Sequence, residues 1–250
     1  MWAELPRVVD EVLAADGDVR CVLLAGEGRA FCAGIDLAHL AQTGAQQAPR
    51  EGVDGARQRE ELRRNILRMQ DAFTSLERLH CPVVAAVHGA CYGAGVDLAT
   101  AADVRVCSAD ARFCVKEVDV GLAADVGTLQ RLPSIVGHGV ATEMSLTARV
   151  VGAEEAVATG LCSRAHPDAT AMLVAARKLC ASIAAKSPLA VAGTKRVLLR
   201  VRDSGSVADN LDYVATWNAA QLITEDVVEA AAAARERRRP VYKGLRRSKL

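Results

Sequence analysis

The spacing of hydrophobic residues predicts alternating helices and strands over the first two thirds of the chain. Apolar residues recur at helical spacing over 5–13 and 57–79, and the second helix is expected to bury Leu62, Ile66, Leu67, Met69 and Phe73. A continuous apolar run at 82–87 is typical of a strand buried on both faces. Shorter runs predict strands at 21–24, 104–107 and 112–115. This alternation indicates an α/β fold built from stacked βα units.

The pattern changes after residue 169, where helical segments follow one another with almost no strand between them. Helical spacing covers 170–185, 188–200, 206–222 and 224–238. We therefore divide the chain into a mixed α/β core over residues 1–185 and a helical region over residues 186–250. A stretch rich in Gln, Gly and Ala at 43–55 is expected to be a surface loop.

Composition and charge narrow the class of protein. Hydrophobic residues make up 51% of the 250 residues but aromatic residues only 3%, so the apolar mass is mainly Ala, Val and Leu. The 31 Lys and Arg nearly balance the 30 Asp and Glu, which leaves no strong field to attract nucleic acid or an anionic membrane. No apolar run reaches the roughly 20 residues of a membrane-spanning helix. We expect a globular protein with no nucleic-acid partner and no membrane span.

The eight cysteines and five histidines show no metal-binding pattern. No two cysteines have C-x-x-C spacing, and no Cys/His cluster has the spacing of a zinc site. We expect reduced, structural thiols and no bound metal. No G-x-S-x-G motif indicates a serine nucleophile either. The lack of metal-binding spacings and of a serine-nucleophile motif favours acid–base chemistry without a metal.

Two glycine-rich loops follow predicted strands, at 26–37 and 88–97. Their small residues let the main chain approach a ligand closely, and a helix is expected to begin just beyond each loop. One backbone N–H from each loop could converge on a single carbonyl oxygen, and each such donor contributes roughly 3–4 kcal/mol to transition-state stabilisation. Each loop taken alone is equally compatible with an ordinary tight turn.

Carboxylates supply the second half of a candidate site. Asp97 directly follows the second loop, and Glu117 and Asp125 lie in a segment that is apolar between its acids. Partial burial raises the pKa of a carboxyl group and suits it to proton transfer near neutral pH. A helix cap or a salt bridge is the ordinary alternative for any single acid, and we assign that role to Asp103 and Asp119.

Several motifs in these same segments resemble the crotonase (enoyl-CoA hydratase/isomerase) superfamily. They are Phe-Cys-Ala-Gly-Ile-Asp-Leu at 31–37, Pro-Val-Val-Ala-Ala-Val-His-Gly at 82–89, Gly-Ala-Gly-Val-Asp at 93–97, Gly-Leu at 160–161 and Lys-Ser-Pro at 186–188. Within the superfamily, residues 116–133 and 214–218 resemble the delta(3,5)-delta(2,4)-dienoyl-CoA isomerases. The resemblance covers nearly the whole chain.

The resemblance implies a fold, an assembly and a binding site. Members have a spiral core of ββα turns and a carboxy-terminal helical region that builds homotrimers, often paired into homohexamers. The thioester oxygen of an acyl-CoA substrate is expected between the backbone N–H groups of Ile35 and Ala94. The substrate-binding positions implied by the motifs are Ala33, Gly34, Ile35, Asp36, Leu37 and Gly95. No cofactor is expected, because coenzyme A is part of the substrate.

The position of Asp125 separates the activities within the superfamily. Ordinary hydratases carry Glu at the positions of Asp97 and Glu117 and Gly at that of Asp125, whereas dienoyl-CoA isomerases carry a third acid there. Moving a 3,5-diene to the 2,4 positions, a step of fatty-acid β-oxidation, requires proton removal at carbon two and proton return at carbon six. The resemblance implies Asp125 as the base, Glu117 as the acid and Asp97 as an electrostatic or positioning partner, with the first two roles exchangeable.

Other activities of the same superfamily are the alternatives. The nearest is an enoyl-CoA hydratase or another enoyl-CoA isomerase with the same oxyanion hole. A catalytically weak acyl-CoA-binding subunit is the alternative from a different class. Relatives usually begin with two strands before the helix that resembles residues 1–5. We therefore expect part of the first ββ unit, with its CoA contacts, to be missing, through a late start site or in a shortened paralogue.

The last three residues resemble a targeting signal. Ser248, Lys249 and Leu250 form the carboxy-terminal tripeptide that the peroxisomal import receptor recognises, and a basic stretch precedes them. We therefore expect import into peroxisomes, or into a peroxisome-derived organelle such as a glycosome.

Overall fold

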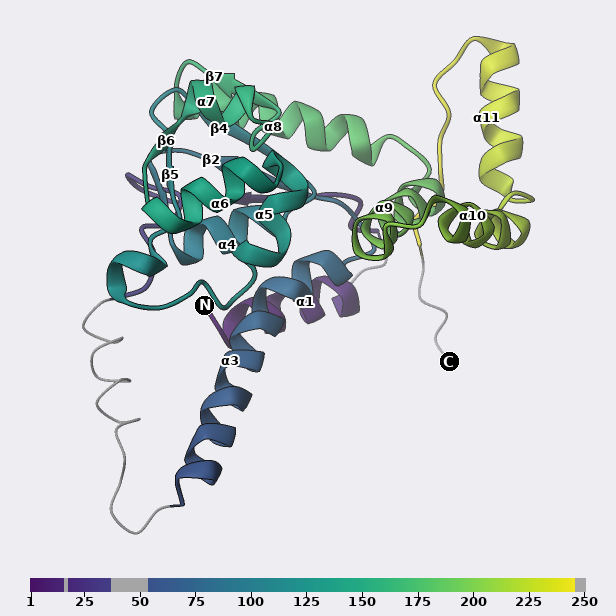
Figure 1. Ribbon diagram of the computed structural model, residues 1–250. Coiled ribbons are helices and arrows are strands. Elements are labelled where there is room, and N and C mark those ends of the chain that lie inside the picture. Colours follow the sequence, from purple (N-terminus) through teal and green to yellow (C-terminus); the bar gives the residue numbers. More distant parts are fainter. Residues whose placement is uncertain (16–17, 37–53, 246–250) are drawn as a thin grey trace.

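A computed structural model describes residues 1–15, 18–36 and 54–245 (Figure 1). Two β-sheets and the helices around them form the core, and three helices near the carboxy terminus lie beside it. Within the described ranges, every helix is too short or too polar to cross a membrane. The predicted surface loop at 43–55 lies outside the described residues except for its last two positions.

The larger sheet has four parallel strands in the order β1-β2-β4-β7. The strands are β1 (Val22–Ala25), β2 (Val83–Val87), β4 (Val104–Ser108) and β7 (Arg164–His166). Val22 is in register with Val83, and Val84 with Val104. Parallel neighbours need crossover connections, and the helices between the strands provide them. The α/β class expected from the alternating pattern is therefore confirmed.

Strand β2 is buried along its whole length, as its continuous apolar run predicts. Successive side chains point to opposite faces of a strand. Val84 and Ala86 pack with Met172 and Ala176 of helix α8 (Ala169–Ala184), whereas Val83, Ala85 and Val87 belong to the main core cluster on the other face. One short strand thus joins two hydrophobic layers.

The smaller sheet carries the elements closest to the candidate site. Its order is β3-β5-β6, with β3 (Ala90–Tyr92) and β5 (Arg112–Cys114) parallel and β6 (Val151–Gly152) antiparallel to β5. The sequence pattern did not predict β3, β6 or β7. These strands have only two or three residues, so they offer no alternation of polar and apolar positions that a pattern could detect.

Short helices follow the strands of the smaller sheet and cover it. Helix α4 (Ala94–Thr100) begins directly after β3, and the 3-10 turn η1 (Glu117–Val120) follows β5. Helices α5 (Thr128–Val136), α6 (His138–Thr147) and α7 (Ala153–Ala158) complete the layer. All seven residues of α4 are buried, so its first turn is shielded from solvent.

Helix α3 (Gly55–Arg78) packs against helix α1 (Glu4–Ala15) near its carboxy-terminal end, where the Trp2 and Phe73 ring centroids are 5.0 Å apart. Figure 1 shows the first half of α3 extending away from the sheets. Phe73 is buried as expected, but Leu67 is 43% exposed, so its predicted place on the inner face is wrong. Leu67 lies about 100° around the helix from Ile66, so it points away from the face that Ile66, Met69 and Phe73 share.

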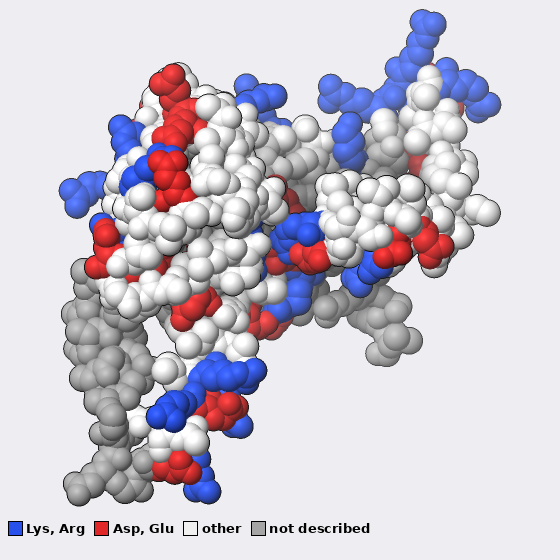
Figure 2. All heavy atoms as spheres, viewed as in Figure 1, with Lys and Arg blue, Asp and Glu red and all other residues white. Residues whose placement is uncertain are grey.

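The four predicted carboxy-terminal helices are confirmed. Helix α8 is followed by α9 (Pro188–Ser204), α10 (Val207–Gln221) and α11 (Glu225–Glu236). Each begins at a side-chain cap, in which an Asp, Ser or Thr oxygen accepts a backbone N–H of the first turn. Acidic and basic side chains are interspersed over the visible face, and basic side chains gather at the end of α11 (Figure 2).

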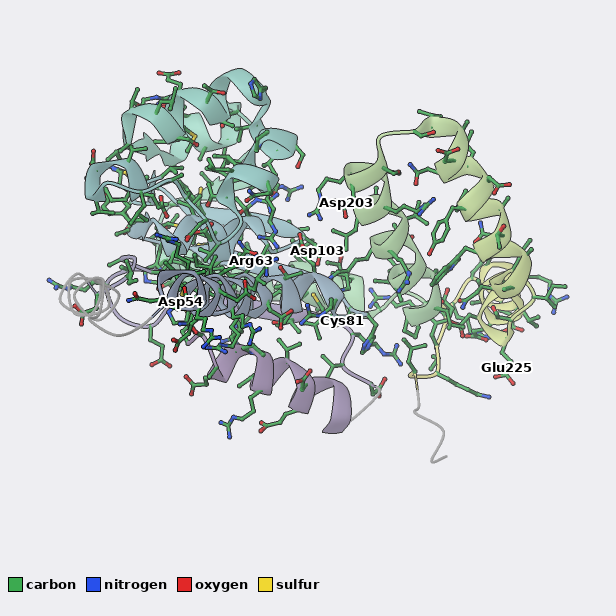
Figure 3. All side chains as sticks on the ribbon, turned by 60° about the horizontal axis from the view of Figure 1, so that its bottom comes forward. Asp54, Arg63, Cys81, Asp103, Asp203 and Glu225 are labelled. Atoms are coloured by element: carbon green, nitrogen blue, oxygen red, sulfur yellow. The ribbon has the colours of Figure 1, made fainter. Side chains whose placement is uncertain are left out.

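Two basic side chains fasten α9 to the core. The buried Lys195 Nζ donates to the carbonyl oxygens of Leu76 (3.0 Å) and Cys81 (3.1 Å) and pairs with Asp103 Oδ2 at 2.8 Å. Cys81 and Asp103 lie on the side of the core toward these helices (Figure 3). About two turns further along α9, Arg202 Nη1 donates to Glu77 Oε1 of α3. Asp103 is therefore the salt-bridge partner that we expected.

Candidate active site

Backbone hydrogen bonds join the two glycine-rich loops. The Phe31 N–H donates to the His88 carbonyl at 2.8 Å, and the Cys32 N–H donates to the Ala90 carbonyl at 3.0 Å. The Tyr92 N–H donates back to the Cys32 carbonyl, also at 3.0 Å. The first loop therefore runs beside β3 as a short extra strand, and the two loops cannot move independently.

Two glycines allow this close approach. A Cβ at Gly95 would lie 2.7 Å from the Cys32 carbonyl oxygen, which is closer than real contacts allow. Gly34 has φ +100°, a conformation that favours glycine, and a Cβ there would lie 3.1 Å from the Tyr92 oxygen. A side chain at either position would push the loops apart.

The joined loops carry the predicted oxyanion-hole residues, Ile35 and Ala94. Ala94 is the first residue of α4 after Gly93, so its N–H has no acceptor inside the helix. Ile35 is 37% exposed and lies three residues beyond the bridge between Cys32 and Cys91. The assignment of both N–H groups to one oxygen stays a prediction.

The other predicted substrate-binding residues lie on the same two loops. Ala33 and Asp36 are exposed, Gly34 is half-buried and Gly95 is buried in the first turn of α4. Leu37 lies outside the described residues.

Asp97 is the most buried of the three acids, with no exposed surface. It lies in the first turn of α4, and its Oδ1 accepts the Thr128 N–H at 2.6 Å. Its Oδ2 has no hydrogen-bond partner among the described residues. Burial raises the pKa of this carboxyl, while the hydrogen bond from Thr128 and the charge of Arg131 act in the opposite direction. The Thr128 N–H thus fixes the position of the Asp97 carboxylate through Oδ1 alone.

Glu117 is the first residue of η1 and faces the start of α4. A Cβ at Gly93 would lie 3.4 Å from Glu117 Oε1, so this carboxyl lies against the backbone that precedes Ala94. Burial, reinforced by the negative charge of Asp97, raises the Glu117 pKa to about 7. At neutral pH a carboxyl group with this pKa can both donate and accept a proton.

Asp125 lies in the turn between η1 and α5 and is half-buried. Burial raises its pKa above the ordinary aspartate value. Its charge also raises the pKa of Asp97 and of Glu117, so the three acids are close enough to interact electrostatically. The structure thus brings together three acids that are up to 28 positions apart in the sequence, each with a raised pKa, beside the joined loops.

This arrangement is suited to moving protons between two places on one bound molecule. Among the described residues, no group of three or more His, Cys, Asp or Glu side chains could hold a metal ion. The eight cysteines are all described and free.

Sequence reasoning missed the groups that hold the three acids. Thr128 binds Asp97 through its main chain, which no side-chain pattern can reveal. Gln70 of α3 donates to the Asp125 carbonyl at 2.6 Å. The signal that could have revealed it is a polar stripe at helical spacing on the buried half of α3, formed by Gln70, Thr74 and Glu77.

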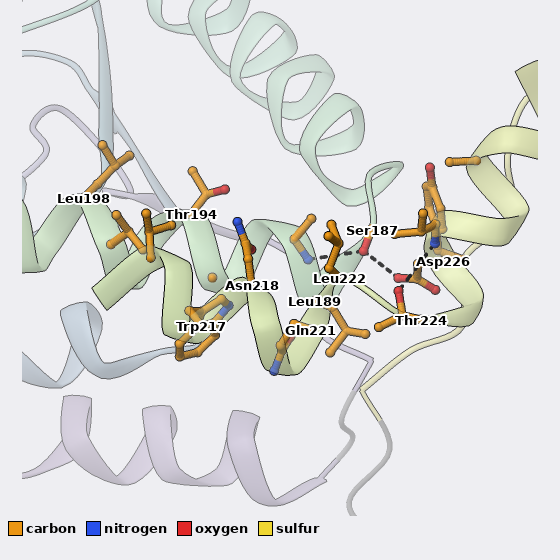
Figure 4. Close-up of a pocket in the computed structure, with 17 residues that line it drawn as sticks. Ser187, Leu189, Thr194, Leu198, Trp217, Asn218, Gln221, Leu222, Thr224 and Asp226 are labelled. Atoms are coloured by element: carbon orange, nitrogen blue, oxygen red, sulfur yellow. Dashed lines mark hydrogen bonds between the residues drawn. The ribbon is translucent and has the colours of Figure 1, made fainter. Parts of the chain in front are cut away.

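Two cavities lie away from the acids, among the carboxy-terminal helices. The larger, of about 470 Å³, is enclosed by α9, α10 and α11 and lined mainly by apolar side chains, with Trp217, Asn218 and Gln221 along one wall (Figure 4). The second, of about 380 Å³, lies beside Asp103 and Lys195. Neither contains Asp97, Glu117 or Asp125, so the proton-transfer site is distinct from both.

Comparison with known proteins identifies the class. The Enoyl-CoA hydratase/isomerase family model matches residues 2–245, nearly the whole chain. The chain therefore belongs to the enoyl-CoA hydratase/isomerase family, which confirms the resemblance and the crotonase fold. Among solved structures, an enoyl-CoA hydratase of Mycobacterium smegmatis is similar over 96% of this chain and 87% of its own, with a TM-score of 0.81 and 31% identity.

Two relatives are more similar in sequence. The peroxisomal Delta(3,5)-Delta(2,4)-dienoyl-CoA isomerase of Arabidopsis thaliana is 47% identical over 98% of this chain and 86% of its own length. The mitochondrial Delta(3,5)-Delta(2,4)-dienoyl-CoA isomerase of Homo sapiens is 49% identical over 94% of this chain and 70% of its own length.

The raised pKa of Glu117 predicts a pH-dependent contribution to stability. The neutral form is favoured in the folded state, so its stabilising contribution is complete below the ordinary value of 4.5 and is lost as the pH rises to about 7. A Glu117→Gln variant stays neutral. Its free energy of unfolding relative to the wild type should therefore increase from about pH 4.5 to about pH 7 and level off above.

Urea unfolding of both proteins at a series of pH values measures this difference. A difference that stays constant across that range would show that the Glu117 carboxyl is not shifted.

Proposed function

We propose that this protein isomerises 3,5-dienoyl-CoA to 2,4-dienoyl-CoA in fatty-acid β-oxidation. The observation that carries the proposal is the third acid, Asp125, which shares a partly buried site with Asp97 and Glu117 and has a raised pKa. The 47–49% identity to relatives named dienoyl-CoA isomerases supports it. Hydration adds the parts of water to two neighbouring carbons, whereas this isomerisation moves protons at two carbons separated by several bonds.

The proposed reaction has two proton transfers. Asp125, as a carboxylate, takes a proton from carbon two, and the electron pair of the broken C–H bond spreads over both the thioester oxygen and the neighbouring diene. Glu117, in its neutral form, then gives a proton to carbon six, and the double bonds settle at positions two and four. The Glu117 pKa of about 7 supports its role as the acid at neutral pH.

The two remaining parts of the site stabilise the intermediate. The N–H groups of Ile35 and Ala94 are proposed to bind the negative thioester oxygen, because the joined loops bring the start of α4 beside the first loop. Asp97, fixed by Thr128, keeps the Glu117 pKa high through its charge. The proposed reaction uses no cofactor beyond the coenzyme A of the substrate.

Replacing Asp125 by Asn should abolish most of the isomerisation, because the amide cannot take the proton from carbon two. We expect kcat to fall about 10²- to 10⁴-fold, the usual contribution of a general base. The measurement is the ultraviolet absorbance of the conjugated 2,4-dienoyl product after addition of a 3,5-dienoyl-CoA. Asp119→Asn is the matched control, since Asp119 is exposed and its carboxyl pairs with Lys116 in the neighbouring turn.

Two results would contradict the proposal. If the wild type hydrates a 2-enoyl-CoA readily but leaves the dienoyl substrate unchanged, the protein is a hydratase. If the wild type binds acyl-CoA and transforms neither substrate, it is an acyl-CoA-binding subunit. Activity that survives in the Asp125→Asn variant would place the base elsewhere.

We further propose that residues 186–250 assemble the protein as a homotrimer or homohexamer. Large apolar side chains are exposed in the carboxy-terminal helical region. They include Val207 (75%) and Leu211 (63%) of α10 and Ile223 (96%) between α10 and α11. Several acidic and basic side chains of α11 pair within the chain, as Glu229 does with Arg238, which leaves the apolar positions as the main unpartnered surface.

Light scattering should give a mass three or six times the 26.4 kDa of one chain. A Leu211→Glu variant should shift the mass toward the monomer, because it places a charge on the proposed contact. A monomeric wild type would contradict the assembly.

Relatives of this chain are assigned to two compartments by name, since the Arabidopsis protein is peroxisomal and the human protein mitochondrial. We propose the peroxisome, or a peroxisome-derived organelle such as a glycosome, on the strength of Ser248, Lys249 and Leu250, which would bind the import receptor. These three residues lie outside the described structure.

Removing residues 248–250 from a protein with an amino-terminal fluorescent tag should leave it in the cytosol, because the receptor would have no signal to bind. Microscopy beside a peroxisomal marker measures the change. Import that continues without the tripeptide would show that the ending is a coincidence.

A further inference from the structure

A polar stripe on helix α3 faces the segment that carries Asp125. Gln70, Thr74 and Glu77 occur at positions i, i+4 and i+7, so they share one face of the helix. This face lies on the half of α3 that packs against the core, where Ala72, Phe73, Ser75 and Leu76 are buried. Polar side chains in such a place need specific partners.

Gln70 holds the backbone of Asp125 directly. Its Nε2 donates to the Asp125 carbonyl oxygen at 2.6 Å, across 55 positions of sequence. A bond to the main chain of a residue restrains the position of its Cα and therefore the origin of its side chain. The bond leaves both oxygens of the Asp125 carboxyl unused, because it goes to the main-chain carbonyl.

Arg131 joins the other two residues of the stripe to helix α5. Its Nε and Nη2 donate to the two Glu77 oxygens at 3.0 and 3.1 Å, and Nη2 also donates to Thr74 Oγ1 at 3.0 Å. The Arg131 residue is only 7% exposed. A bidentate pair of this kind defines both the distance and the plane of the guanidinium group.

The fixed guanidinium supports the turn between Asp125 and Thr128. Gly127 has φ +132°, and a Cβ there would lie 1.8 Å from Arg131 Nη1, so the guanidinium occupies the space directly beside this backbone. The next residue, Thr128, donates the N–H that holds Asp97 Oδ1 at 2.6 Å. The positions of Asp125 and Asp97 thus both depend on the turn formed by residues 125–128.

We propose that Gln70 and Arg131 are positioning residues: from outside the site, they hold the turn 125–128 in the geometry that aims Asp125 and anchors Asp97. Neither residue needs to contact the substrate. The inference deepens the proposed isomerase function and rests on it for its kinetic consequences, since a misplacement of about 1 Å at a reacting group costs roughly 100-fold in rate.

Kinetics should separate positioning from substrate binding. We expect Arg131→Met to lower kcat about 100-fold and Gln70→Met about tenfold, with KM within about twofold of the wild type, because the loops that bind the thioester are untouched. Arg131→Lys keeps the charge but cannot bridge both Glu77 oxygens, so it should restore part of the lost kcat.

Two matched controls test whether the loss of any similar group would have the same effect. Arg149→Met removes another bidentate pair, in which Arg149 donates to Glu155 at 2.7 and 3.0 Å between α6 and α7. Gln130→Met removes an exposed amide next to Arg131 on α5. Both controls should keep kcat within about twofold of the wild type.

Hydrogen–deuterium exchange tests the same idea without any activity. The peptide that contains residues 125–131 should exchange faster in Arg131→Met and Gln70→Met than in the wild type, while peptides from β2 should be unchanged. If the wild type has no isomerase activity but this exchange pattern appears, the proposed function fails and the positioning role stands.

Three results would overturn the inference. The first is a kcat near that of the wild type in both Gln70→Met and Arg131→Met. The second is an unchanged exchange rate in the 125–131 peptide. The third is a parallel loss of kcat and rise of KM with a lowered Tm, which would assign the two residues a general structural role.

Discussion

The candidate active site depends on the electrostatic cost of holding three carboxyl groups close together in partly or fully buried positions. Asp97 has no exposed surface and Glu117 has a pKa of about 7, so their charges are opposed by burial and by each other. Among the residues that the structure describes, no Lys or Arg side chain forms an ion pair with any of these three acids. The protein supplies a single main-chain donor from Thr128 and the more distant charge of Arg131, which partly lower the Asp97 pKa. The acids therefore keep the raised pKa values that proton transfer requires.

The loops and the acids of the candidate site are held in place by different kinds of interaction. Backbone hydrogen bonds and closely packed glycines join the loops that would bind the thioester, so that part of the site is determined by main-chain geometry. The acids are supported instead by side chains. Gln70 of the distant helix α3 donates to the Asp125 carbonyl, and Glu77 of the same helix holds Arg131 of α5. Substrate binding and proton transfer can consequently change independently, which is consistent with a family that contains both hydratases and isomerases.

Much of the fold could be predicted from the sequence, because long periodic segments and the continuous run of β2 give strong signals. The three acids were also identifiable, from their place in recognisable motifs. The remaining features could not be predicted from the sequence, for physical reasons. Strands of two or three residues, such as β6, have no periodicity. Leu67 lies at the edge of the apolar stripe of α3, where the pattern alone does not decide whether a side chain is covered. Gln70 resembled any solvent-facing polar residue, since its partner is a carbonyl oxygen 55 positions away.

Glu77 accepts hydrogen bonds from Arg131 of α5 and from Arg202 of α9 at the same time. Burial alone would raise its pKa, but these two partners outweigh burial and lower it. One carboxylate thereby connects the turn that carries Asp125 to the region of the proposed subunit contacts. Removing either arginine would therefore leave the buried Glu77 carboxylate with one partner fewer, at an end of α3 that both α5 and α9 contact. A single side chain of α3 thus takes part in holding both the turn 125–128 and helix α9.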